Sequence, residues 1–279
     1  MLDKNTLNHL KHKFGFSDGH IADLSKEEIN RYLTLEQVHV AKQEKYFKLQ
    51  NVSSSGTPGQ NESPEDRIIT EVTEEEAKQE LANSSSGPDG VITTKAYDPG
   101  PSTSWIKLET WLIQYGEIAE ASARFEWLKV PTYKDQDVFA IGTSSNLVIL
   151  TDTESFTLKY DEFKFTRTYD FYGQPIYGWV PVEVNKTRAD RRDAGGYGYV
   201  FDIVDANPIR SLRGYMKFST THRNPKWGGE FYDAFSHYAH QETVFVVEPS
   251  FGLPLGGALA LSSESKFDKV TGHVQERLA

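Results

Sequence analysis

The sequence predicts an α+β protein with a mainly antiparallel β body, of sandwich, jelly-roll or open-barrel type. Two observations lead to this prediction. A stretch rich in Ser, Gly, Pro and Glu occupies residues 51–103, and aromatic residues, 13% of the chain, are concentrated after it. We therefore expect a helical hairpin or arm at 1–50, a disordered, flexible acidic linker at 51–103, and an aromatic-rich body at 104–279.

The N-terminal part carries two helix signals. Asp3 can cap a short helix that ends at Gly15, and Ser25 with Glu28 forms a capping box. From there, apolar residues at helical spacing predict one helix that runs to about Leu49. Its apolar stripe supplies four predicted interface residues, Tyr32, Leu33, Val40 and Phe47. Such a stripe needs a partner, which could be the chain's own body or a second protein engaged through the tethered helix.

The linker predicted at 51–103 holds more acids than bases and few apolar residues. This composition buries too little apolar surface to fold alone, so we expect disorder. Within it, Thr73–Leu81 has a second capping box and could form a transient helix.

The body is expected to begin with two helices and to continue as strands. Aromatic and aliphatic residues recur at helical spacing in 104–116 and again in 117–130. From Asp137 onward, eight short β-branched or aromatic runs separated by Gly, Pro, Asn and Asp predict antiparallel strands. Pro181 places its run at a sheet edge or a bulge. Residues 263–278 return to helical spacing and could form a short docking helix.

Composition argues against several function classes. A net charge of −10 disfavours nucleic-acid binding, because phosphate neutralisation drives that binding. The absence of cysteine eliminates disulfides, thiolate zinc sites and cysteine nucleophiles. No segment has the apolar run of a signal peptide or the length of a membrane span. We therefore expect an intracellular protein of cytoplasm or nucleus, or one within an assembled particle, without membrane insertion and without a cofactor.

One set of residues carries a catalytic hypothesis. Asp152 follows an apolar run, and Glu162 and Lys164 stand two apart at the start of a later strand run. This spacing resembles the pattern of restriction-endonuclease-type nucleases, in which two acids hold Mg²⁺ and a lysine positions the attacking water. The alternative is that Glu-x-Lys arises by chance on a surface strand.

A histidine-rich and aromatic segment, 215–240, carries two further hypotheses. His222, His237 and His240 offer nitrogen ligands of the kind that bind zinc or iron. Neither His-x-His nor His-Glu-x-x-His is present, so the alternative is a set of ordinary hydrogen-bonded histidines. The aromatic residues of the segment are typical of a protein interface, with the candidates Trp227, Phe231, Tyr232 and Phe235.

The favoured function is a non-enzymatic structural or assembly protein. It would self-associate, as a homo-oligomer, through its β body and engage a protein partner through the tethered amphipathic helix. A cysteine-free, aromatic β body with a long polar segment also fits a virus or phage particle component, by analogy of composition. Two alternatives remain open: a metal-dependent nuclease or hydrolase that uses the three residues above, and a ligand- or peptide-binding β module that uses Trp179, Tyr197 and Trp227.

Overall fold

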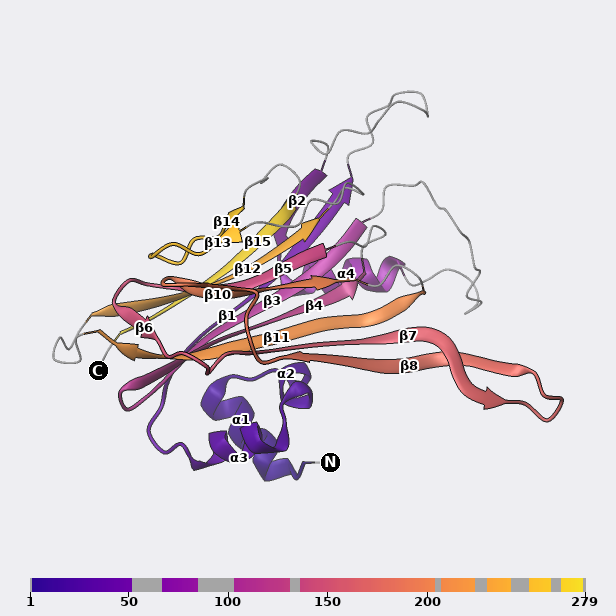
Figure 1. Cartoon of the computed structure of the whole chain (residues 1–279), viewed down its shortest axis with the longest axis horizontal. Coiled ribbons are helices and arrows are strands. Elements are labelled where there is room, and N and C mark those ends of the chain that lie inside the picture. Colours follow the sequence, from indigo (N-terminus) through magenta and orange to yellow (C-terminus); the bar gives the residue numbers. More distant parts are fainter. Residues whose placement is uncertain are drawn as a thin grey trace.

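The computed structural model consists mainly of antiparallel β sheets with few helices, which confirms the predicted β-rich class (Figure 1). Most of the helical residues lie at the N-terminus, and strands make up most of the rest. The residues described are 2–51, 67–84, 103–130, 136–203, 207–223, 230–241, 251–261 and 267–277.

The N-terminal helices begin where the capping signals predict. Their bounds are α1 (Lys4–Phe14), α2 (Asp18–Asp23) and α3 (Lys26–Thr34). The Asp3 carboxylate accepts hydrogen bonds from two backbone N–H groups of the first turn, and Gly15 ends α1 in the left-handed conformation, with φ 65°. Ser25 and Glu28 form the reciprocal capping box of α3.

The larger sheet has eight strands: β1 (His39–Asn51), β2 (Arg67–Val72), β3 (Thr103–Tyr115), β4 (Ile118–Lys129), β6 (Leu147–Ile149), β7 (Ser155–Tyr169), β8 (Pro175–Lys186) and β11 (Ile209–His222). Their order is β2-β1-β3-β4-β11-β7-β8, with β6 paired to β11 beside this path. All pairs are antiparallel. β8 ends the order, in agreement with the edge position that Pro181 predicts.

The second sheet has five strands: β5 (Gln136–Thr143), β9 (Arg191–Asp193), β10 (Gly196–Asp202), β12 (Phe231–Gln241) and β15 (Phe267–Arg277). Their order is β15-β12-β5-β10-β9. A small hairpin, β13 (Phe251–Gly252) with β14 (Ala260–Leu261), packs beside it, and α4 (Glu74–Ser84) packs near β1.

The two large sheets share one hydrophobic core. Phe125 of β4 meets Phe139 of β5 edge to face, with ring centroids 4.9 Å apart, and lies 4.5 Å from the ring of Tyr238 of β12. Such ring contacts between sheets supply much of the buried apolar area.

The opposite face of the larger sheet is covered by α1–α3, which we call the helical cap (Figure 1). Trp111, Ile113 and Tyr215 point from the sheet into this second cluster, where they meet the apolar residues of the cap. We call the face under the cap the outer face of the sheet, and the face toward the second sheet the inner face.

The helix predicted from Ser25 to Leu49 is wrong beyond Thr34. Residues 39–51 form β1, which pairs with β3 from His39 opposite Gln114 to Gln50 opposite Thr103. β1 lies between two strands and buries residues on both faces near its end, so its apolar residues do not alternate strictly and imitate a helical stripe. The N-terminal arm is therefore not separate from the body, because β1 is part of the body's main sheet.

The two helices predicted in 104–130 are also wrong, since these residues form β3 and β4. Both are interior strands, covered by the core on one face and by the cap on the other. In β3 apolar residues lie on both faces, which conceals the period of two. β4 alternates apolar and polar residues from Ala119 to Trp127, but its Ala and Glu residues have high helix propensity. The docking helix predicted at 263–278 is likewise a strand, β15.

The linker prediction is wrong for residues 67–84. Arg67–Val72 adds β2 to the edge of the sheet, and α4 buries Ala77 against Tyr46 and Trp105. The remaining linker residues, 52–66 and 85–102, lie outside the described residues.

Candidate functional site

The hairpin of β7 and β8 extends past the other strands of the larger sheet (Figure 1). We call residues 163–180 the distal hairpin. Its largest uncovered side chains are Phe171 at 97%, Tyr172 at 83%, Tyr169 at 63% and Tyr177 at 59% of their full exposure. Monomeric proteins rarely leave so many rings in one uncovered patch, so this hairpin is the candidate interaction site.

The apolar face of β7 changes sides along the strand. Near its start, Phe156, Leu158 and Tyr160 occupy even positions and enter the core between the sheets. Farther on, Phe163 and Phe165 occupy odd positions. Because neighbouring side chains of a strand point to opposite faces, these two rings lie on the outer face.

The apolar residues of β8 change faces at the same position along the hairpin. Val182, opposite Tyr160, packs on the core, whereas Trp179, opposite Phe163, lies on the outer face. The register of the two strands runs without a shift through this point. The order of residues along the two strands, and not a bulge between them, therefore sets the change, and both strands turn their aromatic residues away from the second sheet.

The aromatic rings of the distal hairpin form a connected ladder on the outer face. Phe163 meets Trp179 edge to face at 5.4 Å between centroids, and Phe165 lies 6.0 Å from Tyr177 and 5.3 Å from Tyr169. The guanidinium of Arg210 lies 4.4 Å from the Trp179 ring centroid and covers the base of the ladder. The upper rings have no such cover.

The opposite face of the distal hairpin has no aromatic rings and combines the aliphatic side chains of Ile176 and Val180 with hydrogen-bonded polar residues. The Lys164 ammonium donates to the Glu162 carboxylate at 2.6 Å, and the Asn207 amide donates to the same carboxylate at 2.7 Å. These hydrogen bonds lower the pKa of Glu162, the one from Lys164 most. The hydroxyls of Thr166 and Thr168 lie 2.6 Å apart. The distal hairpin thus has one aromatic face and one face that mixes hydrogen-bonded and aliphatic side chains.

The tip of the hairpin is a closed turn. The Asp170 carboxylate accepts hydrogen bonds from the backbone N–H groups of Tyr172 at 2.9 Å and Gln174 at 2.8 Å. Gly173 adopts φ 78°, which glycine tolerates without strain. Phe171 and Tyr172 are thereby held at the end of an ordered turn.

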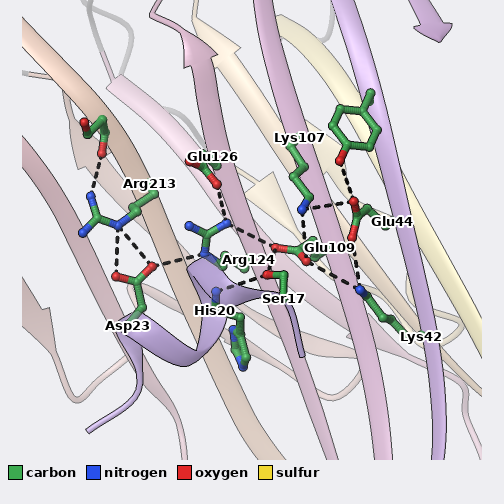
Figure 2. Close-up of polar contacts among 12 residues, drawn as sticks. Ser17, His20, Asp23, Lys42, Glu44, Lys107, Glu109, Arg124, Glu126 and Arg213 are labelled. Atoms are coloured by element: carbon green, nitrogen blue, oxygen red, sulfur yellow. Dashed lines mark hydrogen bonds and ion pairs between the residues drawn. The ribbon is translucent and has the colours of Figure 1, made fainter. Parts of the chain in front are cut away.

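A network of charges joins the helical cap to the sheet (Figure 2). The carboxylate of Asp23, in α2, accepts hydrogen bonds from Arg213 at 2.9 Å and from Arg124 at 3.1 Å. Arg124 also donates to Glu109 at 3.2 Å and to Glu126 at 2.7 Å. Each of these charges has an opposite partner, which is the condition under which buried charges are tolerated, so the network fixes the cap.

His20 lies within this region without a polar partner. It is fully buried, its ring stacks on Trp111 at 4.4 Å between centroids, and neither ring nitrogen has a hydrogen-bond partner among the described residues. Burial, and next the positive charge of Arg124, hold its pKa well below the ordinary value. A neutral histidine in this position packs as an aromatic ring.

The three catalytic candidates do not form one site. Asp152 pairs with Arg192 at 3.2 Å in the turn before β7, while Glu162 and Lys164 pair with each other. Glu162 stands seven residues into β7, which places it about 23 Å along the strand from its start. The nuclease arrangement, which requires all three side chains around one Mg²⁺, is not assembled.

The three histidine candidates are also engaged separately. His222 lies 3.3 Å from the Gln114 amide nitrogen, and His240 Nδ1 lies 2.8 Å from the Asp137 carboxylate. Three residues apart on one strand, His237 and His240 point to opposite faces. In the part of the chain that the structure describes, no group of three His, Asp or Glu side chains could hold a metal ion.

His237 binds the loop between β13 and β14. Its Nε2–H donates to the Gly257 carbonyl at 2.6 Å, and its Nδ1 accepts from the Thr271 hydroxyl at 3.1 Å. Burial lowers its pKa to about 4. Both ring nitrogens thus have partners within the chain, so the position of His237 is structural.

Most predicted interface residues contact the chain itself. The Tyr32 hydroxyl donates a hydrogen bond to Glu120. Phe47 and Tyr232 pack in the core between the sheets, and Tyr32 packs in the cluster under the helical cap, with Val40 against that cluster. Phe235 stacks on His273. Leu33 and Phe231 stay exposed, and Trp227 lies outside the described residues. The N-terminal apolar stripe therefore has its partner in the larger sheet.

The sequence reasoning did not select Tyr169, Phe171, Tyr172 or Tyr177. A signal for them exists in the sequence, because aromatic residues crowd both sides of a turn marked by Asp170 and Gly173. Of the aromatics considered for ligand binding, Trp179 lies on this hairpin, and Tyr197 is buried in the core between the sheets.

Comparisons with known proteins leave the function open. No family model matches the chain. No curated protein matches it either. The chain is weakly similar to a solved structure described as pH-induced modulation of Streptococcus parasanguinis adhesion by Fap1 fimbriae, at 11% identity and a TM-score of 0.25, covering 61% of this chain and 79% of that one. It is also weakly similar to Clostridium perfringens delta-toxin, at 6% identity and a TM-score of 0.17, covering 64% and 86%. Scores this low carry no argument about either fold or function. Among the described helices, none is both long and apolar enough to span a membrane.

Proposed function

We propose that the protein is a non-enzymatic assembly protein that self-associates through the β7–β8 hairpin of its β body. The observation that carries this proposal is the uncovered aromatic surface of the distal hairpin. Taking about 200 Å² for each large ring, the exposed fractions of the four most exposed rings amount to about 600 Å² of surface. Patches of this size on a monomer are commonly binding sites.

The body that carries the hairpin is, in this proposal, a sandwich of two antiparallel sheets that supplies a rigid base. A rigid base favours binding, because little conformational entropy is lost when an ordered hairpin docks. The turn hydrogen bonds of Asp170 and the ring contacts of Phe165 support such order. An assembled virus or phage particle, or another intracellular assembly, remains the setting that composition favours.

A non-enzymatic role is supported by the local pairing of the candidate catalytic groups. Asp152 and Glu162 each form an ion pair with a neighbouring cation, at separate places in the fold. Recruitment of a partner through the N-terminal helix is not part of the proposal, because the sheet already covers the helix's apolar face.

The proposal is tested by sedimentation velocity over a concentration series. The wild-type chain is expected to show a concentration-dependent oligomer, whereas the double variant Phe171→Ser with Tyr172→Ser is expected to be monomeric at the same concentrations. Both side chains are exposed, so the fold should persist, which circular dichroism checks.

The matched control is Ile68→Ser, which removes an exposed apolar side chain from β2 at the other edge of the same sheet. It should associate like the wild type. A wild-type chain that stays monomeric up to millimolar concentration, or a tip variant that associates as strongly as the wild type, would contradict the proposal.

A further inference from the structure

The aromatic face of the distal hairpin points away from the chain's own core. Phe163, Phe165, Trp179 and Tyr177 lie on the outer face, while the second sheet packs on the inner face. The helical cap covers the outer face farther back, over β3, β4 and β11. Among the described residues, neither the core between the sheets nor the helical cap covers the rings of Tyr169 and Tyr177.

The ring pairs of the aromatic face carry no charge, and at its base the Arg210 guanidinium that covers Trp179 forms an ion pair with Asp161 at 3.1 Å. Its cross-strand pairs are Phe163 with Trp179, Phe165 with Tyr177, and Tyr169 with Pro175. The charges of Glu162 and Lys164 lie on the opposite face. Two identical surfaces can pack only when they do not repel each other, and a face whose rings are uncharged and whose basal charges are paired meets this condition.

The available area also matches what a pair of hairpins needs. On this face Tyr169 and Tyr177 expose about 240 Å² of ring surface, and the tip rings of Phe171 and Tyr172 add about 360 Å². Two copies whose contact includes the tip rings therefore bury about 1,200 Å² in total, the lower limit of specific protein interfaces. Aromatic rings pack best against other rings in offset or edge-to-face contacts, which a second ladder provides.

We infer that the aromatic face of the distal hairpin packs against the same face of a second copy of this chain, about a two-fold axis. The inference rests on the proposed self-association and adds its geometry: each copy contributes the same residues, and the ring-free face of each hairpin, which carries Glu162, Lys164 and Ile176, points outward. An interface at the lower limit of area predicts a dimer that dissociates in about the micromolar range.

The first test uses single-cysteine variants, since the chain contains no cysteine. Pro175→Cys places a thiol on the aromatic face, opposite Tyr169, and Ile176→Cys places one on the other face, one residue away. Both positions are exposed. With a short bis-maleimide, the Pro175→Cys protein should give a covalent dimer, and the Ile176→Cys protein should stay mostly monomeric.

The second test introduces a charge on each face. Tyr177→Lys places an ammonium within the aromatic face, where pairing would bury it, and should weaken dimerisation at least about tenfold. Ile176→Lys places the same charge on the opposite face and should leave the dissociation constant unchanged. Both residues are exposed, so neither change disturbs the core.

The outcomes separate this inference from the proposed function. If the wild type associates but both cysteine variants cross-link equally, or Tyr177→Lys still dimerises normally, the face-to-face arrangement is refuted while self-association stands. If the wild type is monomeric at all concentrations, both are refuted. Sedimentation of the monomer with phosphatidylcholine–phosphatidylserine vesicles, lost in the Phe171→Ser and Tyr172→Ser variant, would instead identify a lipid surface as the occupant and overturn the inference.

Discussion

Replacing His237 with glutamine should make the protein less sensitive to acid. His237 lies in β12 with 3% of its surface exposed, and its Nε2–H donates to the Gly257 carbonyl. Glutamine can keep a donor toward that carbonyl but does not titrate. The change therefore removes the protonation equilibrium while it retains a hydrogen-bond donor.

The magnitude follows from the pKa of His237 in the two states. Burial lowers this pKa from 6.5 in the unfolded chain to about 4 in the folded protein. Between these two values the unfolded state binds more protons than the folded state. The free energy of unfolding is therefore highest above about pH 6.5 and decreases as the pH falls toward 4. Between pH 7 and pH 5 the loss is about 1.8 kcal/mol of the free energy of unfolding.

The measurement is urea unfolding at pH 7 and at pH 5, followed by circular dichroism. The wild type should lose about 1.8 kcal/mol more than His237→Gln between these two values. Comparing the pH dependence of the two proteins cancels the other titrating groups, including His20, and any constant cost of the substitution.

An equal pH dependence in both proteins would refute the reasoning. It would mean that His237 titrates near its ordinary pKa, so that the loop bearing Gly257 does not bury it in solution. An NMR titration of the His237 ring protons checks the same point directly, because the folded protein should show no change near pH 6.5.

Three further substitutions test the buried polar groups. His20→Phe should raise the free energy of unfolding at pH 7, measured in urea, by about 1 kcal/mol. The reason is that an apolar ring replaces a ring whose two nitrogens lack partners among the described residues, and a loss of stability would contradict this. Asp23→Ala should lower the free energy of unfolding by about 3 kcal/mol, since the buried Arg124 and the half-buried Arg213 lose a partner. The control Asp18→Ala, at an exposed ion pair, should change it by less than about 0.5 kcal/mol, and equal effects of the two substitutions would contradict the reasoning. Tyr238→Phe should lower the free energy of unfolding by about 1–3 kcal/mol, seen as a lower Tm. Its hydroxyl accepts a hydrogen bond from the buried indole of Trp127 and donates one to the buried carboxylate of Asp137, so an unchanged Tm would contradict this.

Local signals in the sequence predict the helix starts correctly and fail for the interior strands. Asp3 and Ser25 act on backbone groups two or three residues away, so their effect does not depend on the rest of the fold. β1 and β3 become strands because each completes the other's backbone hydrogen bonds across some sixty residues of chain. Leu112 faces the core and Trp111 faces the cap, so the two faces together produce a pattern that periodicity alone assigns to a helix.

The sequence predicts one part of the candidate site, the change of face along β7, but not which rings stay exposed. The shift of apolar residues from even to odd positions, between Tyr160 and Phe163, is visible in the sequence of β7. What lies on each side of the sheet at that point is a tertiary property. Only the placement of the second sheet on the inner face and of the cap farther back leaves the rings of Tyr169 and Tyr177 uncovered.

The contact between Asp23 and Arg213 spans 190 positions of the chain, which bears on the order of events on the ribosome. The helices of the cap emerge long before β11 and cannot complete their docking until β11 has been translated through Lys217. Until then their apolar residues have no finished surface to cover, and a nascent chain in this state is open to aggregation or to chaperone binding. Slowing synthesis ahead of β11 should therefore lower the soluble yield more than slowing it afterwards.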